Sequence, residues 1–123
     1  FTNTWENEPD ECVEWSAGSI NLVVTHSPGH APGHVTFHGH GVYHAGDLLF
    51  VRSAGRVDLP GGDPGAQQRS LVRAKEILSG LPADWRLIPG HRYDNFRGEV
   101  PDWISLGDAL QHNYFLAHIT MPE

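Results

Sequence analysis

The stretch HSPGHAPGH at residues 26–34 decides the fold, because its glycines and prolines predict a tight loop directly after a strand. We expect that strand over residues 19–26, where INLVVT is rich in β-branched residues. The loop would then present His30 outward from the strand end.

Two further motifs repeat this arrangement. HAGDLLF at residues 44–50 follows a predicted hairpin of strands over 34–38 and 42–45, and IPGH at residues 88–91 ends a predicted strand over 85–89. These motifs would place Asp47 and His91 in loops that follow strands, as HSPGHAPGH places His30. Imidazole and carboxylate groups are the usual ligands of zinc and iron. The three motifs therefore predict a metal site formed by His30, Asp47 and His91.

Helices are predicted in the second half of the chain. The first begins at Pro64 after a plausible N-cap at Asp63, and Gly80 marks its end. Its apolar residues recur at helical spacing, at Leu71, Ala74, Ile77, Leu78 and Leu81. A second helix is expected over 106–118, with Ser105 and Asp108 as a variant capping box. Strands, helix, strand and helix predict an α/β domain, a mixed sheet with two main helices on one face.

Composition limits the partners. The 123 residues fit one domain, and a net charge of −7 argues against nucleic acid, which needs a concentrated basic face. The longest apolar runs are too short to span a bilayer, and a single cysteine forbids an intrachain disulfide. We expect a soluble cytoplasmic protein with no nucleic-acid or membrane partner.

Together the three motifs resemble the C-terminal half of the metallo-β-lactamase superfamily, in its glyoxalase II and persulfide dioxygenase branch, over about residues 20–113. The resemblance implies half of an αββα sandwich. It also implies that His30 binds one metal ion, His91 binds a second and Asp47 bridges both, the metal being zinc or iron. The family's other ligands come from an HxHxDH motif, which this sequence lacks.

Other residues near the motifs have two interpretations each. In GRVDLPGGD, at residues 55–63, Arg56 and Asp58 could form a buried ion pair, or Arg56 could contact substrate. Tyr93 could touch substrate or pack against the sheet edge. His34 is expected to support the His30 loop from behind the metal ligands.

The remaining histidines and the cysteine are interpreted as structural. His38 and His40 are expected in a turn and His44 in a strand, although these side chains could offer substitute ligands. Cys12 lies between Glu11 and Glu14 with no adjacent basic residue, so a catalytic thiolate is not expected.

Three functions remain open. The resemblance favours a metal-dependent hydrolase of a small-molecule thioester or ester, in which the missing N-terminal half supplies the other ligands and the isolated chain binds metal weakly and is inactive. A homodimeric half-fold with a vestigial metal site and no catalysis is one alternative. A mono-iron enzyme similar to the persulfide dioxygenases is the other.

Overall fold

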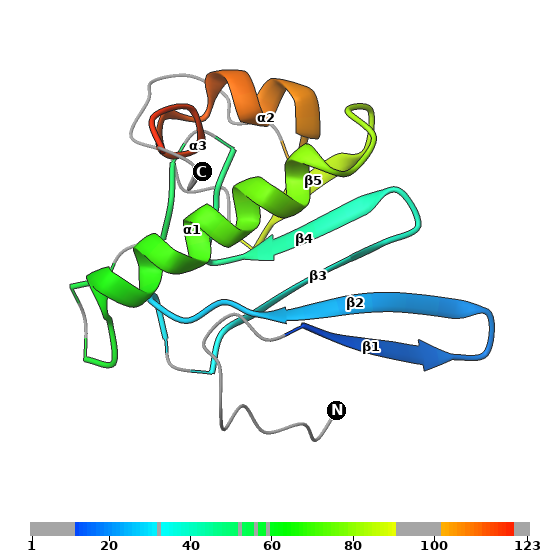
Figure 1. Cartoon of the computed structure of the whole chain (residues 1–123), viewed down its shortest axis with the longest axis horizontal. Helices are drawn as coiled ribbons and strands as arrows, with labels where there is room; N and C mark the ends of the chain where they lie inside the picture. Colours follow the sequence, from blue (N-terminus) through cyan, green and yellow to red (C-terminus); the bar gives the residue numbers. More distant parts are fainter. Residues whose placement is uncertain are drawn as a thin grey trace.

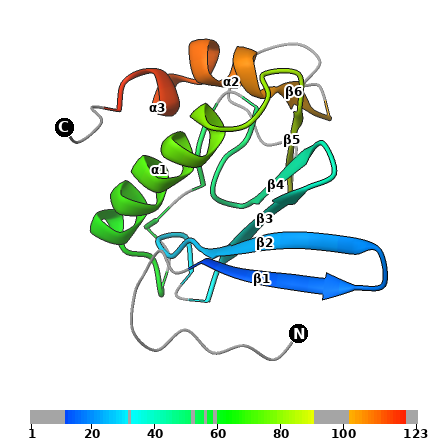
Figure 2. The same ribbon diagram turned by 45° about the vertical axis from the view of Figure 1, so that its right-hand side comes forward.

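The computed structural model describes residues 12–31, 33–51, 53–55, 57–58, 60–90 and 102–119. Its centre is a six-stranded sheet in the order β1-β2-β3-β4-β5-β6. The strands are β1 (Cys12–Ala17), β2 (Ile20–His26), β3 (Val35–Gly39), β4 (Val42–Gly46), β5 (Arg86–Pro89) and β6 (Ile104–Ser105), and the helices are α1 (Pro64–Ser79), α2 (Leu106–His112) and α3 (Tyr114–Ala117). The helices lie on one side of the sheet (Figures 1 and 2).

The predicted strands are confirmed. β2 pairs antiparallel with β3, β3 pairs antiparallel with β4, and β5 pairs parallel to β4 after the chain crosses over through α1. β2, β4 and β5 therefore run in the same direction, and their C-terminal ends meet at one edge of the sheet. This edge is where the three motifs begin.

β1 was not expected. It pairs antiparallel with β2 over its whole length, and a turn at Gly18, whose φ is +61°, joins the two strands. The signal for it was present as an alternation of Val13, Trp15 and Ala17 with polar residues, because such alternation is typical of a strand with one apolar face.

Helix α1 is confirmed at both ends. The Asp63 carboxylate accepts a hydrogen bond from the backbone N–H of Ala66 at 3.1 Å, and Gly80 caps the C-terminus. The helix buries Leu71, Ala74 and Leu78 against Tyr43 and Leu87 of the sheet, within one apolar core. Among the described residues, no helix has the length and apolar character needed to cross a bilayer.

The single helix predicted over 106–118 is wrong, because it breaks at Asn113. The Asn113 side chain is fully buried and caps α3 by accepting hydrogen bonds from the N–H groups of Phe115 and Leu116 at 3.0 and 3.3 Å. Its amide nitrogen donates to the carbonyl oxygens of Phe50 and Ser53 at 2.9 and 3.1 Å. One side chain thus ends α2, begins α3 and holds the segment after Asp47.

The opposite face of the sheet is apolar. The paired strands place Val13, Trp15, Ile20, Leu22, Val24, Phe37 and His44 on this face, opposite the side of Tyr43. Phe37 stacks on His44 with 4.6 Å between ring centroids, and Trp15 and Ile20 are 37% and 48% exposed. Val24 is buried, so the apolar surface that this face leaves available to a partner lies mainly at Trp15 and Ile20.

Replacing Asn113 by alanine should destabilise the chain by roughly 2–4 kcal/mol, because buried carbonyl oxygens lose their donor and α3 loses its cap. Urea unfolding measures the change. Gln111→Ala, at an exposed position of α2, is the matched control and should change stability little. Equal effects of the two substitutions would contradict this role of Asn113.

Stability should also depend on pH through His38. Its ring Nδ1 is buried with no hydrogen-bond partner among the described residues, and burial lowers the pKa of His38 below its usual 6.5. The unfolded chain therefore binds this proton more tightly, so stability is fully present above pH 6.5 and is lost as the pH falls toward the folded-state pKa. Urea unfolding at about pH 7.5 and about pH 5.5 tests this sign. The loss should be smaller in His38→Gln and unchanged in His112→Gln, which alters an exposed histidine.

Candidate metal centre

His30 and Asp47 meet at the edge where β2, β4 and β5 end. The His30 Nε2 atom lies 3.6 Å from the Asp47 Oδ2 atom, and each side chain is 27% exposed. The two groups come from loops 17 residues apart in sequence, so only the shared strand direction brings them together. An imidazole and a carboxylate at this separation, partly open to solvent, suit a shared metal ion.

The imidazole of His34 links the His30 loop to the Asp47 loop through hydrogen bonds. Its Nδ1–H donates to the carbonyl oxygen of Ser27 at 3.2 Å, and its Nε2 accepts the backbone N–H of Asp47 at 2.9 Å. This pattern requires the neutral ring. Burial is the largest influence on the group and lowers the pKa of His34, which favours the same neutral form. His34 therefore fixes the backbone that carries Asp47.

Glycines let three backbone segments approach Asp47. Gly46 has a φ of +55°, and a Cβ atom there would lie 2.7 Å from the Nε2 atom of His34. A Cβ at Gly55 would overlap the carbonyl oxygen of Asp47. A Cβ at Gly90 would lie 3.3 Å from the Asp47 Oδ1 atom, and the Gly90 N–H donates to the Gly46 carbonyl oxygen at 2.8 Å. Because glycine has no side chain, the three backbone segments can approach this closely.

Three of the predicted site residues, Arg56, His91 and Tyr93, lie outside the described residues. Gly90, which precedes His91, packs on the Asp47 carboxylate, so the chain reaches the site immediately before the third predicted ligand. Asp58 is exposed, and its predicted ion pair with Arg56 lies outside the described residues.

His38, His40 and His44 do not form a group with His30 and Asp47. His38 lies within β3 rather than in the expected turn. His40 is in that turn, where its Nε2 accepts the backbone N–H of Asn21 at 3.1 Å, and His44 is in β4 as expected. Among residues that the structure describes, no group of three histidine, cysteine or acidic side chains could hold a metal ion. The described part therefore contributes a pair of donors.

Helix α1 supplies two contacts that sequence reasoning missed. The Ser70 hydroxyl donates to the Pro28 carbonyl oxygen at 2.6 Å, and the Gln67 amide nitrogen donates to the Gly55 carbonyl oxygen at 3.2 Å. Both side chains are buried on the same face as Leu71 and Ala74. Their polarity on an apolar helix face was the available signal, because a buried polar group needs a partner.

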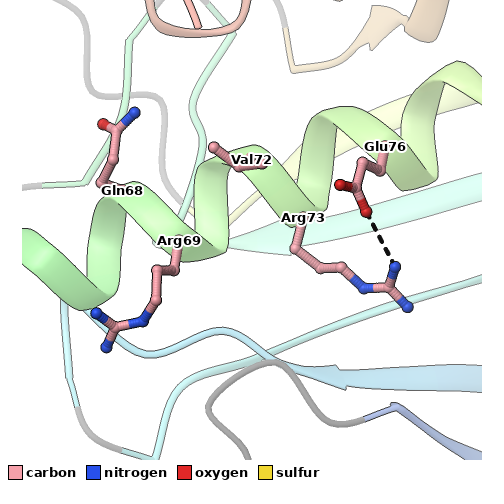
Figure 3. Close-up of a pocket in the computed structure, with 5 residues that line it drawn as sticks. All are labelled: Gln68, Arg69, Val72, Arg73 and Glu76. Carbon is pink, nitrogen blue, oxygen red and sulfur yellow. Dashed lines mark hydrogen bonds and ion pairs between the residues drawn. The ribbon is translucent and has the colours of Figure 1, made fainter. Parts of the chain in front are cut away.

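The environment of Cys12 differs from expectation. The guanidinium group of Arg73 donates to the Cys12 sulfur at 3.4 Å, although 61 residues separate them, and Arg73 also pairs with Glu76 at 3.2 Å. Arg73 and Glu76 line an open groove on α1 together with Gln68, Arg69 and Val72 (Figure 3). None of these five residues belongs to the loops that carry His30 and Asp47, so this groove is separate from the candidate metal centre.

The family model described as the Metallo-beta-lactamase superfamily matches residues 3–91. A hydroxyacylglutathione hydrolase of Aeromonas salmonicida is 37% identical over 89 residues, which are 72% of this chain and 32% of that protein. Hydroxyacylglutathione hydrolase GloC of Haemophilus influenzae is 39% identical over 114 residues, 91% of this chain and 47% of that protein. Mitochondrial persulfide dioxygenase ETHE1 of Homo sapiens is 36% identical over 81 residues, 64% of this chain and 31% of that protein.

Solved structures show the same fold. The crystal structure of BLEG-1 B3 metallo-beta-lactamase matches with a TM-score of 0.66 and 32% identity, over 91% of this chain and 47% of that one. A protein crystallised in a di-iron-bound form matches with a TM-score of 0.59 and 43% identity, over 77% of this chain and 42% of that one. The chain thus spans 31% to 47% of the length of the curated relatives reported above.

The contact of Gly55 with Asp47 gives a direct test of the site's construction. Gly55→Ala should destabilise the chain by roughly 1–3 kcal/mol, because the added methyl group must push the two loops apart. The matched control is Gly33→Ala, since a Cβ at Gly33 meets nothing within 4 Å. Urea unfolding of both variants measures the difference. If both tolerate alanine equally, the loops are not packed as described.

Proposed function

The chain belongs to the metallo-beta-lactamase superfamily, and we propose that it is the C-terminal, metal-binding portion of a hydrolase that cleaves a small-molecule thioester or ester. The observation that carries the proposal is the meeting of His30 and Asp47 at the edge of the sheet where β2, β4 and β5 end, with Gly90 packed against the Asp47 carboxylate. The names of two relatives, both hydroxyacylglutathione hydrolases, support the thioester class.

The donor set fits zinc or iron, as one or two ions. His30 offers a ring nitrogen and Asp47 two carboxylate oxygens at the same point, and both side chains are partly exposed. A bound metal supplies a Lewis acid that polarises a carbonyl group and activates water. Asp47 would hold the metal through its carboxylate oxygens, beside the His30 ring nitrogen. His34 keeps the Asp47 backbone fixed through the N–H bond at 2.9 Å.

A complete metal site needs further ligands from a second polypeptide segment. Stable zinc sites have three or four protein ligands. This sequence has no HxHxDH motif, and the described part offers only a pair of donors. We propose that the partner that completes the site also covers the apolar sheet face around Trp15, Ile20 and Phe37, since both needs would be met by the missing N-terminal half of the sandwich.

Two alternatives have some support. The exposed Trp15 and Ile20 would also suit a homodimer of half-folds without catalysis, whose metal site is vestigial. The persulfide dioxygenase relative favours iron chemistry on a sulfur substrate instead of hydrolysis.

Reconstitution tests the function. The 123-residue chain alone should bind zinc weakly and show no thioesterase activity, because it lacks ligands. Adding, as a separate polypeptide, the HxHxDH-bearing half of a hydroxyacylglutathione hydrolase should yield a heterodimer with stoichiometric metal that hydrolyses a hydroxyacylglutathione thioester. Native mass spectrometry reports the assembly and its metal together. Asp47→Asn should lower the activity by about a hundredfold or more, beyond the usual effect of residues behind the ligands, whereas Asp84→Asn, at an exposed position, should not.

Each alternative predicts a different outcome. If the chain forms a metal-free homodimer and does not bind the added half, the hydrolase function is contradicted and the structural role is supported. An iron-loaded assembly that oxidises a persulfide but leaves thioesters intact would support the dioxygenase.

A further inference from the structure

The two peptide groups that precede His30 are both held by the start of α1. The Ser70 hydroxyl donates to the Pro28 carbonyl oxygen at 2.6 Å, and the Gly29 carbonyl oxygen accepts the N–H of Asp63, the N-cap of α1, at 2.8 Å. Ser70 is buried, so water does not compete for its hydrogen bond. The backbone that leads into His30 is therefore fixed to the helix at two successive carbonyl groups.

The helix also packs on the backbone of the His30 loop. A Cβ atom on Gly29 would lie 2.5 Å from the Cα atom and 2.6 Å from the Cβ atom of Gln67. Gly29 has a φ of +141°, a conformation that favours glycine. The loop and the helix are thus in direct contact, with no room for a side chain between them.

Gln67 holds the Asp47 loop from the same helix, three residues before Ser70. Its side-chain nitrogen donates to the Gly55 carbonyl oxygen at 3.2 Å, and the residue is buried. Gly55 lies directly against Asp47, because a Cβ atom on Gly55 would overlap the Asp47 carbonyl oxygen. The Gly55 N–H donates to the Leu48 carbonyl oxygen at 3.1 Å, which closes this loop. The segment that carries Asp47 is therefore joined to α1 through Gln67.

The position of α1 is itself fixed by the core. Leu71, Ala74 and Leu78 pack in one apolar cluster with Tyr43 and Leu87 of the sheet. Figures 1 and 2 show the helix lying along the sheet, with its start near the end of β2. The helix therefore gives both loops a common support that does not move independently of the strands.

Two donors on separate loops form a metal site only if their separation is maintained. The His30 Nε2 and Asp47 Oδ2 atoms are 3.6 Å apart, although 17 residues separate them in sequence. If the loops moved independently, metal binding would have to order them, and this cost in free energy would weaken the binding. Contacts from one helix to both loops remove part of that cost in advance.

We propose that Ser70 and Gln67 are positioning residues of the metal centre. Ser70 fixes the loop of His30, Gln67 fixes the loop of Asp47, and α1 thereby sets the separation of the two ligands. Both residues act through backbone carbonyl groups, and neither is a ligand. This inference rests on the metal site of the proposed function, but not on the reaction that the site performs.

Two substitutions in the 123-residue chain test the proposal, each directed at one loop. Ser70→Ala removes the hydroxyl donor, and Gln67→Met removes the amide donor at nearly constant side-chain length. Ser79→Ala and Gln68→Met are the matched controls, because they change exposed residues of the same helix. Amide hydrogen exchange followed by NMR reports the opening of each loop. Cobalt titration followed by visible absorption reports metal affinity and coordination.

Ser70→Ala should speed exchange of the Ser27 N–H, which closes the His30 loop by donating to the His34 carbonyl oxygen at 2.8 Å. Gln67→Met should speed exchange of the Gly55 N–H. We expect about threefold to tenfold in each case, the effect of one lost hydrogen bond.

Each of the two substitutions should also weaken cobalt binding about tenfold or more, as expected for groups that orient metal ligands. Exchange in the paired strands β3 and β4 should stay at the parent rate, and both control variants should match the parent in every measurement. A residue that only stabilised the fold would not change metal affinity in a chain that remains folded.

The proposal is overturned if Ser70→Ala and Gln67→Met bind cobalt as tightly as the parent chain. It is also overturned if they speed exchange equally throughout the sheet, which is the result of overall destabilisation. If Ser70→Ala does not fold, the same two measurements on Gln67→Met decide. A parent chain that binds no cobalt contradicts the proposed function, while exchange at Ser27 and Gly55 still decides whether α1 holds the two loops.

Discussion

The close approach of three backbone segments to Asp47 is the constraint on which the candidate site depends. Gly46, Gly55 and Gly90 come from different parts of the chain, and a side chain on any of them would press on Asp47 or on the histidine behind it. Since β2, β4 and β5 share a direction, the sheet brings the loops to one edge, but only glycine lets them touch. The geometry of the site thus depends on glycine at these three positions.

Much of the fold could be predicted from local patterns. The β-rich run before His30, the hairpin before Asp47 and the capped helix after Asp63 each have a short-range signal, and each is confirmed. The position of the candidate ligands at strand ends followed from the same signals. The parallel pairing of β4 with β5 did not follow from them, because it joins strands that are about 40 residues apart in the chain.

The features that were missed depend on tertiary contacts. Asn113 breaks the predicted helix because its side chain finds the carbonyl oxygens of Phe50 and Ser53, about 60 residues earlier. Arg73 reaches Cys12 in the same way, and Gln67 reaches Gly55 from the start of α1. A sequence shows that such residues are polar and where they fall in a helix. It does not show which distant atoms these side chains will form hydrogen bonds with.

β1 is the outermost strand in the described part of the sheet, and most of its residues are exposed. Such an edge offers main-chain groups to any other extended segment, which is how sheets join into aggregates. Glu14, exposed near the middle of β1, places a negative charge there, and a second acidic copy would have to bring its own charge against it. Pairing of two copies along β1 would therefore bring like charges together, which disfavours that pairing.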